Sequence, residues 1–226
     1  MQDFNSGGLT PIRQEVAPLR TRIIESMRRA IERGFLKPGE RLVEKDLCEQ
    51  LGVSRTSLRE ALRELEAEGV IAQAPARGLV VAKISRRDAE NIYLIRGDVE
   101  ALIIGQFINL ASDAQIAEAL ENCDTLIDAY KQGEFADIVE AKRAFYAHIC
   151  EVAGNGVAMD LLSRLTLRTA QLRSHSVVRK ERQAQSVQEI HALAEAIRAR
   201  DSDAARHAAK THVENAARSA LAYAEP

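Results

Sequence analysis

Two short amphipathic segments separated by a glycine constrain the fold of this chain more than any other feature. Leu47 and Leu51 lie one helical turn apart, Gly52 ends their helix, and Ser54 is a strong N-cap for a second helix over residues 55–68. The second helix turns leucines inward and carries basic residues at its leading end. This order is typical of a helix-turn-helix, in which the second helix enters the major groove of DNA by its N-terminus.

The segments on either side complete a winged domain. Apolar residues at helical spacing predict a first helix over residues 19–33. Short β-type runs within residues 70–81 predict a hairpin with Arg77 and Gly78 near its tip. An arginine at such a tip can reach the minor groove or a phosphate. Residues 12–84 are therefore predicted to form a winged helix-turn-helix.

The charge of the chain is divided unevenly between its two parts. Residues 11–87 contain 16 Lys and Arg against 11 Asp and Glu, whereas residues 88–226 contain 15 against 21. Basic residues on an exposed helix are most often simply solvated, so charge alone is weak evidence for a polyanionic partner. The ordered series of helix, glycine turn, basic helix and arginine-tipped hairpin is what indicates double-stranded DNA.

Residues 85–226 have a helical pattern without strands. One apolar stripe, expected to face inward, consists of Ile92, Ile95, Val99, Leu102, Ile103 and Leu110. Further helices are expected at residues 114–131, 135–153, 157–178, 182–200 and 202–223. Short loops favour antiparallel packing. The predicted fold is mainly α: a winged helix-turn-helix of three helices and a β-hairpin, followed by an all-helical antiparallel bundle of six to seven helices.

The run LKPGERLVEKDLCEQLGVSRTSLREALRELEAEGVI, followed by PARG, resembles the DNA-binding domain of GntR-type bacterial repressors. The resemblance implies operator contacts at Arg41, Lys45, Arg55, Ser57, Arg59, Arg77 and Gly78. Ser57 departs from the family, which often has Pro or Thr there, although a serine hydroxyl can still reach a phosphate or a base edge.

The second part resembles the FCD domain, the helical effector domain of the FadR-like GntR branch. The residues that carry this resemblance are RGDVE at 96–100, FYAHICEVAGN at 145–155 and EIHALAEAIRARD at 189–201. It implies a regulator that is controlled by a small-molecule effector. Because one recognition helix reads only a few base pairs, we expect a homodimer on a palindromic operator. The family favours repression over activation.

Most FCD domains bind a divalent metal through one Asp and three His. The four matching positions of this sequence hold Lys142, Tyr146, Ile190 and His212. Because a metal site needs three or four protein ligands, we predict no metal cofactor at the family site. A rearranged site that uses His148 and His191 with His212 stays open as an alternative.

The sharper hypothesis is that Lys142 takes over the work of the metal and holds an anionic effector, such as an organic acid. Tyr146 follows Lys142 by one helical turn, so both side chains can face one cavity. The resemblance also implies that Arg96 points into the pocket, and weaker candidates are Arg168, Arg173 and His212. Two alternatives stay open: Lys142 is paired with Glu100 or solvated, or the pocket takes a neutral or acyl ligand.

Other classes of protein are weakly supported. The sequence has no G-x-S-x-G motif, no phosphate loop and no acid–base pair that would indicate an enzyme. An architectural DNA-binding protein needs no ligand cavity. The isolated cysteines Cys48, Cys123 and Cys150 indicate neither a disulfide framework nor a zinc finger. With no apolar run of about 20 residues, we expect a cytoplasmic protein without a membrane partner, and a flexible segment at residues 1–11.

Overall fold

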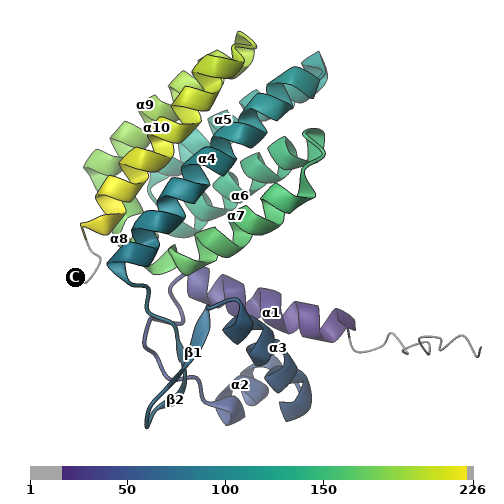
Figure 1. Cartoon of the computed structure of the whole chain (residues 1–226), viewed down its shortest axis with the longest axis vertical. Coiled ribbons are helices and arrows are strands. Elements are labelled where there is room, and N and C mark those ends of the chain that lie inside the picture. The colour runs from purple at the N-terminus through teal and green to yellow at the C-terminus, as the bar shows by residue number, and fades with distance from the viewer. Residues whose placement is uncertain (1–16, 223–226) are drawn as a thin grey trace, which may run out of the picture.

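The computed structural model describes residues 17–222 and has the predicted two-part architecture (Figure 1). The predicted flexible segment at residues 1–11 lies outside the described residues. The first part consists of α1 (Ala17–Glu32), α2 (Glu44–Leu51), α3 (Arg55–Ala67), β1 (Ile71–Ala74) and β2 (Gly78–Val81). The second part consists of α4 (Arg86–Leu110), α5 (Asp113–Gln132), α6 (Phe135–Val152), α7 (Gly156–Arg168), α8 (Ala170–Val177), α9 (Lys180–Arg198) and α10 (Ser202–Leu221).

Local signals fix the helix-turn-helix. Gly52 adopts the left-handed conformation (φ 65°) and ends α2 by donating its N–H to the carbonyl of Cys48. The Oγ atom of Ser54 accepts a hydrogen bond from the backbone N–H of Ser57 at 3.2 Å and starts α3. The inner face of α3 is fully buried: Leu58, Ala61, Leu62 and Leu65.

The wing is a two-stranded antiparallel hairpin. Its register runs from Ile71 opposite Val81 to Ala74 opposite Gly78, within the segment in which the sequence predicted a hairpin. Arg41 forms an isolated antiparallel bridge to Val80, which attaches the segment before α2 to the wing. The wing and α2 lie at the end of the molecule that is farthest from the bundle (Figure 1).

Two expectations for the bundle were wrong in detail. The helix expected at residues 157–178 is divided into α7 and α8, because Thr169 leaves the helical region (φ −100°, ψ 6°). The apolar stripe of α4 was also misassigned. Ile92 and Ile103 are buried, but Ile95, Leu102 and Leu110 are 47%, 42% and 64% exposed, and the buried face continues instead through Ile104 and Phe107. The length of α4 allowed two apolar faces, and the sequence did not say which one faces the bundle.

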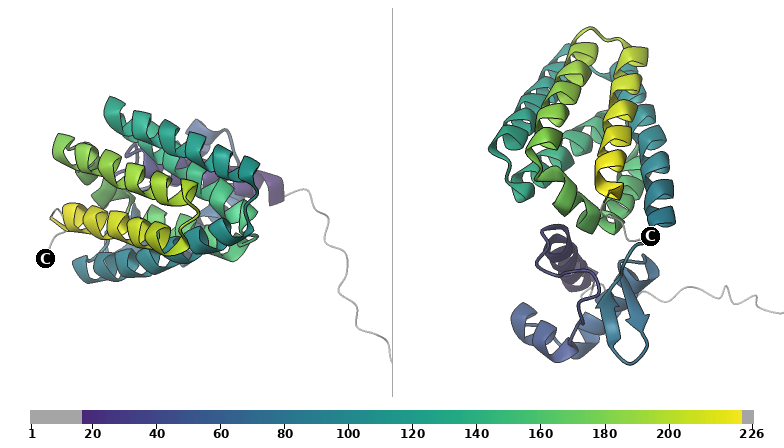
Figure 2. Two further views of the ribbon diagram at one scale, coloured as in Figure 1. Left: turned by 90° about the horizontal axis from the view of Figure 1, so that it is seen from above. Right: turned by 90° about the vertical axis from the view of Figure 1, so that its left-hand side faces the viewer.

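The two parts are joined by packing as well as by the chain. Helix α1 contacts α7 and α8 directly beneath the bundle (Figures 1 and 2). Leu167, at the end of α7, is 3% exposed and belongs to the hydrophobic core of the winged domain, together with Ile31 and Val70. The hydrophobic core of the winged domain therefore includes a side chain of the helical bundle.

Candidate DNA-binding surface and effector cavity

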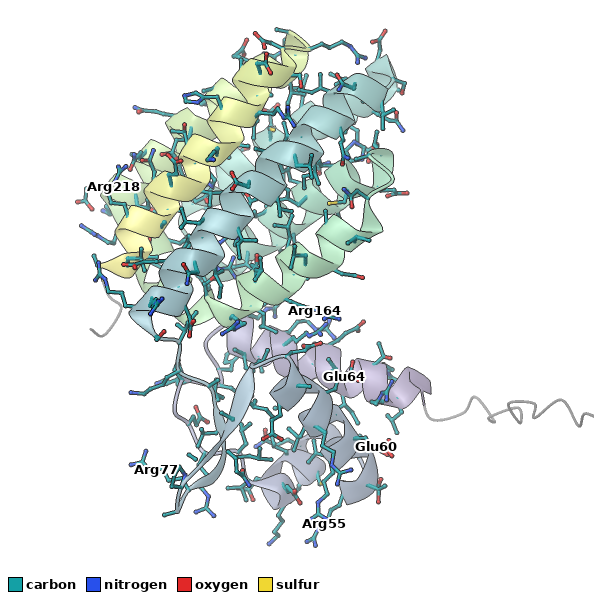
Figure 3. The ribbon with its side chains drawn as sticks, viewed as in Figure 1. Arg55, Glu60, Glu64, Arg77, Arg164 and Arg218 are labelled. Atoms are coloured by element: carbon teal, nitrogen blue, oxygen red, sulfur yellow. The ribbon has the colours of Figure 1, made fainter. Side chains whose placement is uncertain are left out.

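The predicted DNA contacts lie on the face of the winged domain that points away from the bundle. Arg55 at the start of α3 and Arg77 at the tip of the wing both extend from this end (Figure 3). Arg41, Lys45 and Gly78 are exposed as well. Lys45, which the resemblance to the GntR family placed before the first helix of the helix-turn-helix, lies in the first turn of α2. Ser57 is half-buried, and its hydroxyl is 3.0 Å from that of Ser54, so the cap partly occupies it.

Arg59 has a partner that the sequence did not predict. Its Nε lies 3.0 and 2.9 Å from the two carboxylate oxygens of Glu44, and its Nη2 lies 2.9 Å from Oε2. The hydrogen bond from Arg59 lowers the pKa of Glu44 below its ordinary value, despite some opposing desolvation. Arg59 must leave or share this carboxylate before it can bind a base or phosphate.

A cavity lies at the end of the bundle that faces α1. Its volume is about 540 Å³ with the open mouth included. Its walls are formed by Glu32 of α1, Arg96 and Glu100 of α4, Val139, Lys142, Arg143 and Tyr146 of α6, Met159, Leu162, Ser163 and Thr166 of α7, and Arg173 of α8. A second cavity shares Arg96, Lys142 and Arg173 with the first and reaches Tyr93 and His212. The structure thus brings together five of the six predicted effector residues.

Arg168, the sixth, does not line either of these cavities. It lies at the junction of the two domains, where its guanidinium approaches Gly69. It was a weaker candidate at the sequence level, and Thr169 places it on α7 while Arg173 lies on α8. Arg168 is therefore not a candidate for contacting an effector in the cavity.

Glu100 is the centre of the buried polar groups. Arg96 donates to its Oε1 from Nε at 3.1 Å and from Nη2 at 2.7 Å, and the hydroxyl of Tyr146 donates to its Oε2. The Nζ atom of Lys142 lies 3.8 Å from the same Oε2. Burial raises the pKa of Glu100, but the charges of Lys142 and Arg96 and these hydrogen bonds lower it to about 2. Glu100 is therefore ionised.

The pairing of Lys142 with Glu100 is one of the two alternatives that the sequence left open for this residue. The side chain of Lys142 is 14% exposed, and its Nζ lies 5.5 Å from the ring centre of Tyr146. Burial lowers the pKa of Lys142 to about 8, and the neighbouring charges of Arg96 and Arg173 act in the same direction, while Glu100 opposes them. Lys142 is still mostly protonated at neutral pH and adds to the positive charge of the cavity.

The cavity has more buried positive charge than negative charge. In the two adjoining cavities, Arg96, Arg173 and Arg182 are 1%, 8% and 5% exposed. With Lys142 they are accompanied, among the described residues, by the buried carboxylates of Glu100 and Glu189 and the half-buried one of Glu32. Nη1 of Arg96 and both Nε and Nη2 of Arg173 have no hydrogen-bond partner within residues 17–222. Unpartnered buried guanidinium groups are costly, so these nitrogens are available to an anion or to water.

His212 belongs to the wall of the second cavity. Its Nδ1 lies 2.7 Å from Glu189, whose carboxylate is also held by Arg182 at 2.8 Å. Burial, reinforced by the charge of Lys142, lowers the pKa of His212 to about 4. The neutral ring donates Nδ1–H to the carboxylate, which leaves Nε2 as an acceptor without a partner in the described part of the chain.

The residues at the family's metal positions do not fit a divalent ion. The Nζ atom of Lys142 is cationic, Ile190 has no lone pair, and Tyr146 is engaged with Glu100. The rearranged site is not assembled either: His148 contacts Gln115 and Glu118, and His191 is exposed. Within residues 17–222, no cluster of three His, Cys, Asp or Glu side chains has the geometry of a metal site.

Sequence reasoning missed three residues of these sites. Glu44 pairs with Arg59, Glu189 orients His212, and Glu32 brings a carboxylate from α1 to the cavity. The spacing of Arg96 and Glu100, one helical turn apart within an apolar helix, was a usable signal for a buried pair. No comparable local signal relates Glu44, Glu189 or Glu32 to their partners, because those contacts join separate helices.

Known proteins resemble the chain over both parts. The family of bacterial regulatory proteins called gntR matches residues 19–81, and the FCD domain matches residues 91–215. The HTH-type transcriptional regulator McbR of Escherichia coli (strain K12) is 28% identical over 187 residues, which are 77% of this chain and 80% of McbR. A solved structure of E. coli McbR/YncC has a TM-score of 0.77 at 25% identity and covers 87% of this chain and 93% of that one.

Of two further relatives from the same organism, one is named an activator and the other a repressor. The Glc operon transcriptional activator is 30% identical over 174 residues, 69% of this chain and 68% of the activator. The HTH-type transcriptional repressor RspR is 25% identical over 197 residues, 87% of this chain and 86% of the repressor. These proteins are transcription regulators and not enzymes. Within residues 17–222, every helix is too short or too polar to span a membrane.

The two family matches cover the helix-turn-helix with its wing and most of the helical bundle that holds the cavity. The chain therefore belongs to the GntR family of DNA-binding transcription regulators, with an FCD domain as its effector-binding part.

Proposed function

We propose that the protein is a homodimeric regulator whose operator binding is controlled by a small anionic effector in the cavity of the helical domain. The observation that carries this proposal is the excess of buried cations there, with unpartnered nitrogens on Arg96 and Arg173. An anion is the ligand that compensates such charges, and a carboxylate or phosphate accepts paired N–H groups from a guanidinium. A neutral or acyl ligand would leave the excess charge buried and unpaired.

The anion is proposed to bind without a metal. Lys142 and Arg173 supply the positive charge that the family's metal would otherwise supply, and Glu100 holds Lys142 and Arg96 in position. The neutral Nε2 of His212 offers an acceptor to a hydroxyl or N–H group on the same ligand. One tightly held equivalent of zinc or nickel in protein purified without chelators would contradict this part of the proposal.

The dimer is proposed to form through the outer face of α4 and α7, which are neighbours in the bundle. Large apolar side chains are exposed on both helices: Leu94, Ile95, Leu102 and Leu110 on α4, and Val157 and Leu161 on α7. A hydrogen bond between Asn155 and Gln106 brings the N-terminus of α7 beside the later turns of α4. Exposed apolar groups concentrated on two neighbouring helices favour a protein interface.

Two experiments test the effector. The first is thermal unfolding of the wild type with acetate, lactate, succinate, citrate and inorganic phosphate, where the fitting anion raises the melting temperature. The second is fluorescence anisotropy with a DNA duplex selected from a random pool, measured with and without that anion. Lys142→Met and Arg173→Met should weaken anion binding, whereas Lys131→Met, an exposed lysine on α5, should not. Unchanged binding in both cavity variants would refute the proposed site.

The regulatory sign is proposed to be repression, as the family favours. The relatives include both a named activator and a named repressor, so the sign is decided by measurement. Transcription from a reporter that carries the selected operator at its promoter should fall when the protein is present and rise again with the anion. An architectural DNA-binding protein would instead bind selected and random duplexes alike and ignore every acid of the panel.

A further inference from the structure

The effector cavity is lined on one side by the DNA-binding domain. Glu32, the last residue of α1, shares this cavity with Arg173 of α8 and Arg143 of α6. Of the lining residues that the structure describes, Glu32 alone comes from the winged domain. An anion bound to Arg173 would therefore share a small space with a carboxylate of the domain that it has to control.

Charges are complementary where α1 meets the bundle. Burial lowers the pKa of Arg173, and the carboxylate of Glu32 is among the groups that oppose this effect. Glu32 and Glu25 also favour the charged form of Arg143, next to its main partner Glu140. The pKa of Glu140 is lowered mainly by its hydrogen bond with Arg143, and the charges of Arg29 and Arg33 at the end of α1 act in the same direction. These charges favour contact between the C-terminal end of α1 and the bundle, at the place where Glu32 lines the cavity.

Helix α1 is firmly attached to the recognition helix. The two helices share the core of the winged domain and are also linked by ion pairs. Nη2 of Arg28 lies 2.5 and 2.7 Å from the carboxylate oxygens of Glu68, which follows α3, and Nε of Arg20 lies 3.5 Å from Glu64. Because interdigitated cores resist deformation, a tilt of α1 carries α3 with it.

We propose that Glu32 is the residue through which the DNA-binding domain senses the effector. A bound anion takes over the cations that attract Glu32 and also repels its carboxylate. The end of α1 is released from the bundle, and α3 changes its orientation relative to the second recognition helix of the dimer. This inference rests on the proposed anion site, since it needs an anion next to Arg173.

Thermodynamic linkage between the anion site and the operator site distinguishes a sensing role of Glu32 from a purely structural one. If Glu32 and the anion repel each other, removing the charge of Glu32 must tighten anion binding to the free protein. The same change must reduce the factor by which the anion alters operator affinity, because coupling between two sites is reciprocal. A merely structural role for Glu32 predicts a lower melting temperature with both quantities unchanged.

The experiment compares full-length wild type, Glu32→Gln and the control Glu66→Gln. Glu66 is an exposed carboxylate near the end of α3 in the same domain, and it does not line the cavity. The probe is the acid of the panel above, including inorganic phosphate, that gives the largest thermal shift with wild type. Its dissociation constant is measured by calorimetry, and the operator dissociation constant by anisotropy with and without the acid.

The expected result for Glu32→Gln is anion binding tightened by about three- to tenfold, the size of one charge–charge interaction at a partly exposed site. Its anion effect on operator affinity should shrink by a similar factor, and Glu66→Gln should behave like wild type. If wild type responds to the acid and Glu32→Gln responds equally, the sensing role of Glu32 is refuted while the anion site stands. If no acid binds wild type, the anion site fails and this inference fails with it.

Discussion

Arg59 of the recognition helix is hydrogen-bonded through Nε and Nη2 to the carboxylate of Glu44, the first residue of α2. The side chain of Arg59 remains 60% exposed, so the pair is held at the surface, where DNA would approach. A residue that matches a family DNA contact is thus occupied by an acidic neighbour while no DNA is bound. The carboxylate of Glu44 would therefore compete with DNA for the guanidinium of Arg59.

We expect Glu44→Gln to strengthen operator binding by up to about fivefold, because an exposed ion pair is worth about 0–1 kcal/mol and must be given up on binding. The dissociation constant is measured by anisotropy at several salt concentrations. Glu49→Gln removes an exposed charge from the same helix without freeing Arg59. If both variants gain equally, general repulsion from the phosphates explains the effect and the competition for Arg59 does not.

Arg55 and Arg77 should differ in what they contribute to binding. Arg55→Ala or Arg59→Ala should cost about 1–3 kcal/mol of operator affinity if the residue binds guanine with two donors. Arg77→Ala, at the wing, should weaken operator and random DNA alike and reduce the salt dependence. The measurement is affinity for the selected operator against a scrambled duplex. An equal loss on both duplexes would assign Arg55 to a phosphate.

Anion binding should weaken as the pH rises above about 8. Burial lowers the pKa of Lys142 to about 8, so the free protein loses this positive charge between pH 7 and pH 9.5. A bound anion raises that pKa again, and the affinity changes about tenfold for each unit of the rise. Calorimetry across this pH range tests the expectation. Lys142→Arg, which stays charged, should bind the anion with almost constant affinity over this range. A wild type whose affinity is equally constant would contradict the expected role of Lys142.

Glu100→Gln should destabilise the protein by about 3–5 kcal/mol, because it leaves Arg96 and Lys142 buried without their carboxylate. The free energy of unfolding in urea is the measurement, with Glu121→Gln as a control at an exposed site of α5. Inorganic phosphate should restore part of the loss in this variant, since it supplies the missing negative charge. A variant as stable as wild type would mean that Glu100 does not compensate these cations.

Leu102→Glu should weaken the proposed dimer by at least about tenfold, because a charge would be buried in the centre of an apolar interface. Sedimentation velocity over a range of concentrations reports the change. Ala192→Glu, at an exposed position of α9, adds the same charge away from α4 and α7. A wild type that is monomeric at every concentration would remove the basis for a palindromic operator.

The winged domain could be predicted closely because its signals are local. Gly52 and Ser54 fix the turn and the start of α3 through their own backbone and side-chain geometry, and both act in the structure as the sequence indicated. In α4 the same reasoning failed. Ile95 and Leu102 are as apolar as Ile103, and the positions of α6, α7 and α10 decide which face is covered.

The lining of the cavities could be predicted in part, and the role of these residues in effector binding stays a prediction. The resemblance to the FCD domain implied Arg96 and pointed to Lys142, Tyr146 and His212, and Arg173 was a weaker candidate. The structure places these residues around two adjoining cavities. Arg168 lines neither cavity and lies beside Gly69 at the junction of the two domains. The acidic partners Glu32 and Glu189 come from other helices, and contacts between helices leave no trace in local spacing.

Leu167 shows that the two domains are not independent modules. It is supplied by α7, yet it is buried in the core of the winged domain. A hybrid protein that joined residues 12–84 to an unrelated sensor would open an apolar hole in that core, unless the new sensor brought a side chain of similar size to the same place. Exchange of sensors during evolution is therefore restricted to partners that preserve this one side chain, whatever ligand they recognise.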